Sequence, residues 1–379
     1  MTELEQIQAL RSDLLARFPE RREAIDGSLA AVLAGEHVLL LGPPGSAKSL
    51  LVRAIAQAFG GVYFERLLTK FSTLEELFGP VSLRALEQDR YLRITTGKLP
   101  EAHWVVIDEV FKASSAILNS LLSAMNERIF HNGSAVEMPL ISLFGASNEL
   151  PDGKELEALF DRFLLRFDVQ YLLRPSSLRA ILLAPERAPS VALSLDVLRE
   201  AQAQVRRIAI TDDTLQALIS IRDSCKAEGI VASDRRWKKT LKVVQATAYL
   251  AGETSTTPED LLVLSHALWR EPKEYAKVAH LVGTLADPVS AKAAEILDAA
   301  RETAGKVTAL RTTDRKSYVS QAAQALDEFI AQQEKLRELG RSAGPRAKQA
   351  LSDAGQEIGQ LHTDLARTLS AGLGLGGKH

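Results

Sequence analysis

Short runs of apolar residues alternate with helical patterns up to about residue 174. The apolar runs have the length of buried strands, and they predict strands at residues 37–41, 61–68, 103–108, 141–147 and 163–169. Before and between them, apolar residues recur every three or four positions, which predicts helices at residues 1–36, 48–59, 116–127 and 155–162. Strands that alternate with helices are typical of a parallel sheet with helices on both faces, so this part is predicted to be α/β.

Only helical patterns follow Pro175. Thr211, Ser233 and Thr257 have cap-forming side chains and are followed by acidic residues or proline, so three short helices are expected to begin there. Longer patterns predict a helical hairpin or a three-helix bundle, with helices at residues 274–304, 313–339 and 345–369. The predicted parts are an α/β domain, a small helical domain, a helical bundle and a disordered tail, at residues 1–190, 191–272, 273–370 and 371–379.

Composition and charge narrow the class of protein. The net charge is −2, so no global basic field indicates nucleic acid, and such a role would need a local patch. Cys225 is the single cysteine, which excludes an internal disulfide and a cysteine-rich metal site. The N-terminus lacks the basic start of a signal peptide, and no apolar run reaches the roughly 20 residues that span a bilayer. We therefore expect a soluble cytoplasmic protein without membrane insertion.

A glycine-rich segment between the first strand and the next helix carries the clearest chemical signal. It consists of Gly42, Pro43, Pro44, Gly45, Ser46, Ala47, Lys48 and Ser49, followed by Leu50. It matches the phosphate-binding pattern G-x-x-x-x-G-K-[ST], except that Ala47 stands where the last glycine usually lies. Backbone N–H groups would wrap the phosphates, Lys48 would reach the β- and γ-phosphates, and Ser49 would bind Mg²⁺. The segment predicts binding of ATP and Mg²⁺; the alternative is a chance turn before a helix.

Two acidic residues at the end of an apolar strand give a second signal. Asp108 and Glu109 directly follow the apolar residues 104–107. Asp108 would hold a metal-bound water, and Glu109 would orient and polarise the water that attacks the γ-phosphate. Two acids after a strand are common by themselves, but together with the phosphate-binding loop they favour ATP hydrolysis.

Three further positions are weaker signals by themselves. Asn148 follows the strand predicted at 141–147 and could hydrogen-bond the attacking water or the γ-phosphate. Arg162 ends a short predicted helix and could be a cation supplied in trans to the nucleotide of a neighbouring subunit. Arg235 or Arg236, near the start of a later helix, could point back at the nucleotide. The alternatives are a turn residue for the asparagine and solvated surface charge for the arginines.

These motifs together resemble the AAA+ superfamily and, within it, the MoxR family, with the closest likeness to RavA-type members. The resemblance covers roughly residues 5–270. It is carried by segments 42–50, 69–80, 97–102, 108–112, 116–122, 126–128, 147–151, 159–163 and 233–239. RavA-like loops also carry alanine at the position of Ala47. RavA-type proteins insert a compact β-rich module between C-terminal helices, and the helical patterns here predict that this module is missing.

The resemblance implies an architecture and residue roles that spacing alone does not show. It implies a five-stranded AAA+ sheet followed by a helical lid, and hexameric rings with ATP at the subunit interfaces. By matching position, Asn148 is sensor 1, Arg162 is the trans-acting arginine finger, and Arg235 is sensor 2 of the lid. Arg166 is a second finger candidate of lower rank.

Two insertions also match elements of the family. Residues 79–97 resemble the insertion in helix 2, and residues 130–134 resemble the pre-sensor hairpin, with an Asn-Gly turn signal. In relatives both usually face the pore or the substrate. Relatives are chaperone-like remodellers of protein complexes, often with a partner that carries a von Willebrand factor A domain.

The leading hypothesis is therefore a ring ATPase that remodels or matures a protein client. The alternatives are a DNA-associated motor, a magnesium-chelatase-like metal-insertion ATPase and a nucleotide-switched scaffold. The near-neutral charge and the lack of an added DNA-binding module make a nucleic-acid partner the weaker hypothesis. The C-terminal helices could either dock the partner or only stabilise the ring.

Overall fold

The computed structural model describes residues 1–151, 153–183, 190–313, 315–341, 343 and 345–372, and it divides into two compact units, residues 1–279 and 280–379. The predicted boundary at residue 190 falls within the first unit and stays a prediction. The predicted tail lies outside the described residues from residue 373 on. Among the described residues, no helix is both long enough and apolar enough to cross a membrane.

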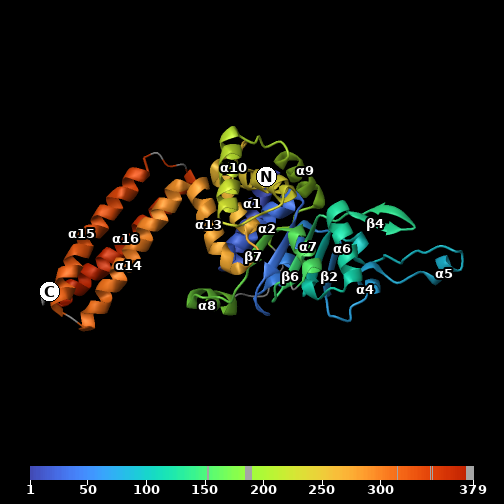
Figure 1. Cartoon of the computed structure of the whole chain (residues 1–379), viewed down its shortest axis with the longest axis horizontal. Coiled ribbons are helices and arrows are strands. Elements are labelled where there is room, and N and C mark those ends of the chain that lie inside the picture. Colours follow the sequence, from blue (N-terminus) through green and yellow to red (C-terminus); the bar gives the residue numbers. More distant parts are fainter. Residues whose placement is uncertain (152, 184–189, 314, 342, 344, 373–379) are drawn as a thin grey trace. The chain divides into compact units, whose positions relative to one another are not determined.

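A five-stranded parallel sheet forms the centre of the first unit (Figure 1). Its order is β2-β3-β6-β1-β7. The strands are β1 (His37–Leu41), β2 (Tyr63–Leu67), β3 (Trp104–Asp108), β6 (Ser142–Ser147) and β7 (Phe163–Asp168). All five were predicted, because strands covered on both faces are almost continuously apolar and stand out from the helical patterns around them. The predicted α/β class is confirmed.

Helices that precede and connect the strands cover the sheet. They are α1 (Glu3–Arg17), α2 (Arg22–Ala34), α3 (Lys48–Phe59), α6 (Ser115–Glu127) and α7 (Lys154–Arg162). The N-terminal helical pattern is divided into α1 and α2 around Pro19 and Glu20, and Glu20 has a left-handed φ of 60°. α2 ends at Gly35, which adopts the left-handed conformation that closes many helices and turns the chain into β1.

Two insertions extend from the same edge of the sheet (Figure 1). The first follows α4 (Leu74–Phe78) and contains α5 (Leu83–Leu86); the second is the hairpin β4 (Ile129–Asn132) and β5 (Ser134–Glu137). The Asn-Gly signal is confirmed as a hairpin turn, with Gly133 at a φ of 75°. Short 3-10 helices, η1 (Leu99–Glu101) and η2 (Val110–Lys112), lie on either side of β3.

Helices follow β7 in the rest of the first unit. They are α8 (Pro175–Leu183), α9 (Leu195–Val205), α10 (Asp212–Ala227), α11 (Asp234–Leu250), η3 (Pro258–Leu264), α12 (Ser265–Leu268) and α13 (Pro272–Ala286), which runs past residue 279. The three predicted starts are confirmed as caps: Thr211 and Ser233 accept backbone N–H groups, and Thr257 forms a capping box. The third helix begins as the 3-10 helix η3, and α8 and α9 were not predicted.

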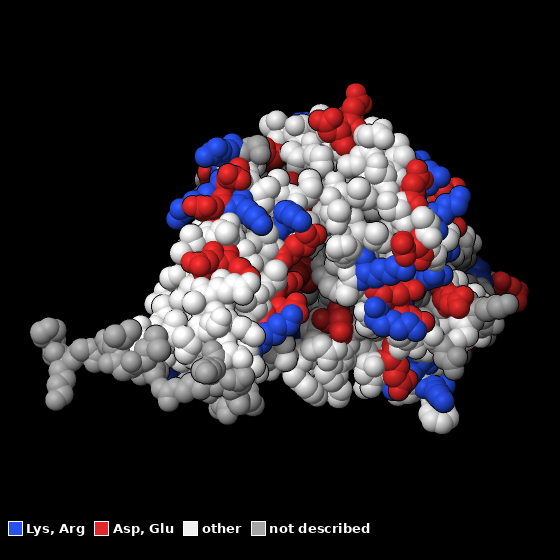
Figure 2. All heavy atoms as spheres, turned by 60° about the vertical axis from the view of Figure 1, so that its left-hand side comes forward, with Lys and Arg blue, Asp and Glu red and all other residues white. Residues whose placement is uncertain are grey.

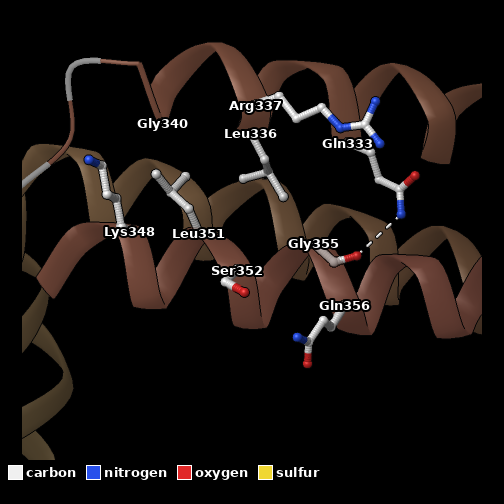
Figure 3. Close-up of a pocket in the computed structure, with 9 residues that line it drawn as sticks. All are labelled: Gln333, Leu336, Arg337, Gly340, Lys348, Leu351, Ser352, Gly355 and Gln356. Atoms are coloured by element: carbon white, nitrogen blue, oxygen red, sulfur yellow. Dashed lines mark hydrogen bonds between the residues drawn. The ribbon is translucent and has the colours of Figure 1, made fainter. Parts of the chain in front are cut away.

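The second unit is a three-helix bundle of α14 (Pro288–Thr313), α15 (Arg315–Leu339) and α16 (Pro345–Gly372), which confirms that prediction. A single helix over 274–304 was wrong. Pro288 lacks an N–H group and begins α14, while the Asp287 side chain caps it by accepting the N–H of Ser290 at 2.9 Å. A groove of about 370 Å³ lies between α15 and α16, where Gln333 donates to the Gly355 carbonyl (Figure 3).

Candidate nucleotide site

The phosphate-binding loop leaves the carboxyl end of β1 and leads into α3. The Gly42 N–H donates to the Ser147 carbonyl of β6 at 3.0 Å. Gly42 has a φ of 145°, and a Cβ there would lie 2.1 Å from the Val169 carbonyl oxygen. Glycine is therefore required at this position by both the backbone conformation and the close neighbour.

Ala47 adopts the left-handed conformation, with φ 68° and ψ 22°, immediately before α3. The usual loop has glycine at this position, and glycine reaches this conformation without a steric cost. The sequence showed which residue departs from the pattern, but only the backbone shows that the departure carries strain.

Lys48 is buried in the loop, with 8% of its surface exposed. Its Nζ donates to the carbonyl oxygens of Gly42 at 2.7 Å and Pro43 at 2.8 Å. Burial lowers the pKa of the ammonium, while the charges of Asp108 and Glu109 oppose that shift. The cation therefore lies against the loop backbone, within the electrostatic influence of the acidic pair, where a phosphate chain could lie.

The acidic pair lies at the carboxyl end of β3, two strands away from the loop: Asp108 is the last residue of the strand and Glu109 follows it. Asp108 pairs in register with Ala146 of β6, and its Oδ1 accepts the Glu109 N–H at 3.0 Å. Glu109 has a left-handed backbone, with φ 52°, and its carboxylate lies 3.2 Å from the Lys112 ammonium. Strained backbones of this kind concentrate at functional sites, which supports the assignment of Glu109.

Asn148 follows β6, the strand between β3 and β1. Ser147 pairs in register with Leu41, the last residue before the loop. The exposed Asn148 therefore emerges at the same edge as the loop and the acidic pair. The structure brings these three predicted elements together at the carboxyl ends of adjacent strands, where open parallel sheets bind ligands.

Arg162 lies at the opposite end of the strands, where their amino termini lie. It ends α7 and directly precedes Phe163, which pairs with His37 at the start of β1. The five residues of β1 separate this end from the loop, a length of about 16 Å at about 3.3 Å per residue. An arginine side chain does not span that length, so Arg162 does not reach the loop of its own chain.

Asp161 links Arg162 to the helical region. Its carboxylate lies 3.8 Å from Arg162, 2.7 Å from Arg235 and 3.2 Å from Arg236. Burial raises the pKa of Asp161, but Arg236 and Arg235 together outweigh burial and leave the pKa lowered. Arg235 therefore lies beside Arg162 at the amino-terminal end of the strands, away from the loop. The sequence had left open whether Arg235 or Arg236 points back at the nucleotide or is solvated surface charge.

The other two arginines are buried within the chain. Arg236 donates to Asp161 Oδ1 and to four carbonyl oxygens, those of Asp161, Phe163, Leu164 and Ala267. Arg166 is 3% exposed, donates to the carbonyls of Trp269 and Phe160, and stacks over the Phe160 ring. Arg162 and Arg235 are more accessible, with 19% and 42% of their side chains exposed. Their exposure supports ranking them above Arg166 and Arg236 as candidates to contact a nucleotide.

A cavity of about 740 Å³ beside the loop was not predicted from the sequence. Tyr171 connects it to the loop by donating to the Pro44 carbonyl at 3.0 Å. Phe167, His266 and Tyr275 contribute neighbouring rings, with centroid separations of 4.6 and 5.2 Å. Burial lowers the pKa of His266 to about 4, so its ring is neutral at pH 7. The Phe167 and His266 rings are tilted and the His266 and Tyr275 rings are stacked. Aromatic rings that line a cavity next to a phosphate loop are suited to a planar base, and their positions are too far apart in sequence to form a motif.

Comparisons with known proteins agree with this geometry. Residues 5–205 match a family model described as the MoxR domain in the MoxR-vWA-beta-propeller ternary systems, and residues 213–282 match an AAA lid domain. An uncharacterized protein of Methanocaldococcus jannaschii is 46% identical over 72% of this chain and 74% of its own length. Chaperone MoxR1 of Mycobacterium tuberculosis is 26% identical over 65% of this chain and 71% of its own length.

A solved structure supports the fold alone. The crystal structure of a candidate ATPase from Cytophaga hutchinsonii has a TM-score of 0.61 and 17% identity, and the match covers 75% of this chain and 94% of that one. The sheet order, the loop after β1, the acids after β3 and the helical lid define an AAA+ ATPase fold. Within that class, the chain belongs to the MoxR family.

Proposed function

We propose that this chain hydrolyses ATP at the interfaces of a ring of identical subunits, a hexamer as in the family it resembles. The observation that carries the proposal is the separation of Arg162 from its own phosphate-binding loop by the length of β1. Arg162 and Arg235 share Asp161 at the amino-terminal end of the strands. The loop, Glu109 and Asn148 lie at the carboxyl end. A complete site therefore needs the loop of one copy and the arginines of the next.

The residues at the carboxyl ends of the strands, around the phosphate-binding loop, fit ATP and Mg²⁺. The loop residues and Leu50 bind the phosphates, and the Ser49 hydroxyl and the Asp108 carboxylate are the oxygen ligands that would hold Mg²⁺. That ion would neutralise charge on the phosphates. Glu109 orients the attacking water, Asn148 hydrogen-bonds it or the γ-phosphate, and the cavity beside Tyr171 takes the adenine base.

The energy of hydrolysis is proposed to remodel or mature a protein client, together with a partner that carries a von Willebrand factor A domain. The matching family model describes MoxR domains in systems with such a partner, and one relative is named a chaperone. On the face drawn in Figure 2, basic and acidic side chains are interspersed. A continuous basic track, which a DNA-associated motor would need, is not visible on that face.

Mixing two inactive variants tests the shared site. Glu109→Gln retains the arginines but loses the residue that orients water, and Arg162→Ala retains its own loop edge but cannot complete its neighbour's. Each alone is expected to bind ATP and to turn over about 10³-fold more slowly or worse. In a mixed ring, an Arg162→Ala loop can meet a Glu109→Gln arginine, so ATPase activity is expected to reappear. Mixed preparations without any recovery, from variants that assemble normally, would contradict the trans arrangement.

Two further measurements separate the alternatives. Lys48→Ala is expected to abolish nucleotide binding, and retained binding would overturn the loop assignment. A pull-down with the ATP-bound Glu109→Gln variant is expected to recover a client and a partner with a von Willebrand factor A domain. ATPase activity stimulated by DNA would favour the motor, and an assembled wild type with no turnover would favour the scaffold.

A further inference from the structure

A pocket of about 510 Å³ lies away from the phosphate-binding loop, between the sheet edge and the helical region of the first unit. α7 and β7 form one wall, and the start of α11 and the segment from α12 to α13 form the other. Arg166 and Arg236 both line this pocket. The two guanidinium groups are almost equally buried, at 3% and 4% exposure, so they can be compared directly.

The two arginines differ in how many of their N–H groups find a hydrogen-bond acceptor in the protein. A guanidinium has five N–H groups. Arg236 makes five hydrogen bonds, one of them to the Asp161 carboxylate, so its charge and its donors are both matched. Arg166 has two described carbonyl acceptors, and its Nε has no acceptor among the described residues. No carboxylate of the described residues forms an ion pair with Arg166 either.

A buried charge without a counter-ion is costly, because it has lost its hydration without gaining a partner. Stacking on the Phe160 ring, with the guanidinium carbon 3.8 Å from the ring centroid, compensates only partly. The acids near the pocket mouth do not supply the missing charge: Glu274 pairs with Arg270 and Glu271 with Lys273, and Glu157 has no described ion pair with Arg166. Three arginines and four carboxylates line the pocket, and Arg166 is the arginine among them that has no carboxylate partner among the described residues.

We propose that this pocket binds a small oxyanion, a carboxylate or a phosphate group, on the guanidinium of Arg166. The planar fork of arginine matches both groups by paired hydrogen bonds. Because the pocket walls come from the sheet edge and from the lid helices, the bound anion contacts both parts. The site is separate from the phosphate-binding loop and does not depend on the proposed ATPase function.

Titration with inorganic phosphate tests the site, in the Lys48→Ala background so that the loop does not contribute. Phosphate is expected to raise the Tm saturably, relative to sodium chloride at equal ionic strength. Arg166→Met removes the charge at similar length and is expected to weaken phosphate binding at least tenfold. Arg270→Met removes an exposed arginine from the pocket mouth and is expected to change the affinity less than twofold. Equal binding by the Arg166→Met variant, or no saturable effect, would overturn the proposal.

Two further experiments identify the anion and test the site without relying on the folding of a variant. Acetate and succinate in the same titration distinguish a carboxylate ligand from a phosphate ligand; saturable binding of either class that depends on Arg166 supports the site. Tungstate in crystals of the wild-type protein gives an anomalous signal that needs no substitution. A peak within hydrogen-bond distance of Arg166 supports the proposal, and peaks confined to the phosphate-binding loop contradict it.

Discussion

The Asp161 carboxylate accepts a hydrogen bond from Arg235 at 2.7 Å, although the two residues are 74 positions apart in the chain. This contact joins the end of α7 to the start of α11. Because Arg162 lies next to Asp161 in the chain, the candidate finger and the candidate sensor share one counter-ion. In the ring proposed above, a subunit would present both cations to its neighbour as one preassembled group.

Asp161→Asn tests whether that shared counter-ion positions the arginines. The amide keeps the shape but loses the charge, so Arg162 and Arg235 are expected to move, and turnover is expected to fall on the order of 10²-fold. The affinity for ATP should change little, since the phosphate-binding loop lies at the opposite, carboxyl end of the strands. Stability should fall by about 1–3 kcal/mol, because Arg236 is buried and loses its ion pair.

Asp196→Asn is the matched control, since Asp196 pairs with Arg199 at 3.0 Å on an exposed surface. It is expected to change neither turnover nor stability measurably. Wild-type turnover in a folded Asp161→Asn ring would show that Asp161 is only structural.

Ala47→Gly is expected to relieve backbone strain in the phosphate-binding loop. A left-handed alanine costs roughly 1–2 kcal/mol, and the added freedom of glycine in the unfolded chain returns roughly 0.4–1 kcal/mol of that. The net gain in the free energy of unfolding is therefore expected to lie between about 0 and about 1.6 kcal/mol, measured by urea denaturation. Ala217→Gly, inside α10, should instead destabilise the protein by roughly 0.5–1 kcal/mol. Equal losses in both variants would show that the loop conformation is not as described.

Asn132 couples the two insertions. Its side chain accepts the Arg93 N–H at 2.7 Å and donates to the Arg93 carbonyl at 3.1 Å, while Phe130 stacks on Phe78. Asn132→Ala removes both hydrogen bonds, a loss of about 2 kcal/mol at about 1 kcal/mol per net bond, and is expected to increase hydrogen exchange over residues 79–97 by roughly 30-fold. His131→Ala, at an exposed neighbouring position, should leave that exchange unchanged. Unchanged protection in both variants would mean that the insertions are independent.

His37 makes the first unit sensitive to acid. Its Nδ1 accepts the Leu143 N–H at 3.0 Å, so the neutral ring donates from Nε2 to the Met125 carbonyl, also at 3.0 Å. Burial is the main cause that lowers the pKa of His37 to about 3. The unfolded chain binds a proton below pH 6.5 that the folded chain does not, so stability is complete above pH 6.5 and falls towards pH 3.

The slope from His37 should approach about 1.4 kcal/mol per pH unit between those limits. Urea denaturation at a series of pH values measures the slope for the wild type and for His37→Gln, which cannot titrate. His131→Gln, at an exposed position, is the control and should retain the wild-type slope. An unchanged slope in the His37→Gln variant would show that His37 is not responsible.

Much of the fold was predictable because its signals are local. The strand at 37–41 and the helix at 48–59 match β1 and α3 residue for residue, since a buried strand is apolar throughout and a glycine-rich loop must follow it. The break before Pro288 was missed, because apolar spacing continues across it and hides the lost N–H donor. The division of the N-terminal helix at Glu20 was missed for the same reason, since a left-handed residue leaves no trace in the apolar pattern.

The sequence by itself determined the phosphate-binding loop, the acidic pair and the family, because these depend on residue types at fixed spacing along a short segment. Tertiary structure decided what those residues face. It placed Arg162 and Arg235 together on Asp161 and away from Lys48. It also left Arg166 buried with no carboxylate partner in the described part of the chain, while Arg236 has one. Such contacts join residues far apart in the chain. Charge and hydrogen bonding act through space, so only the folded arrangement shows which arginine is available to a ligand.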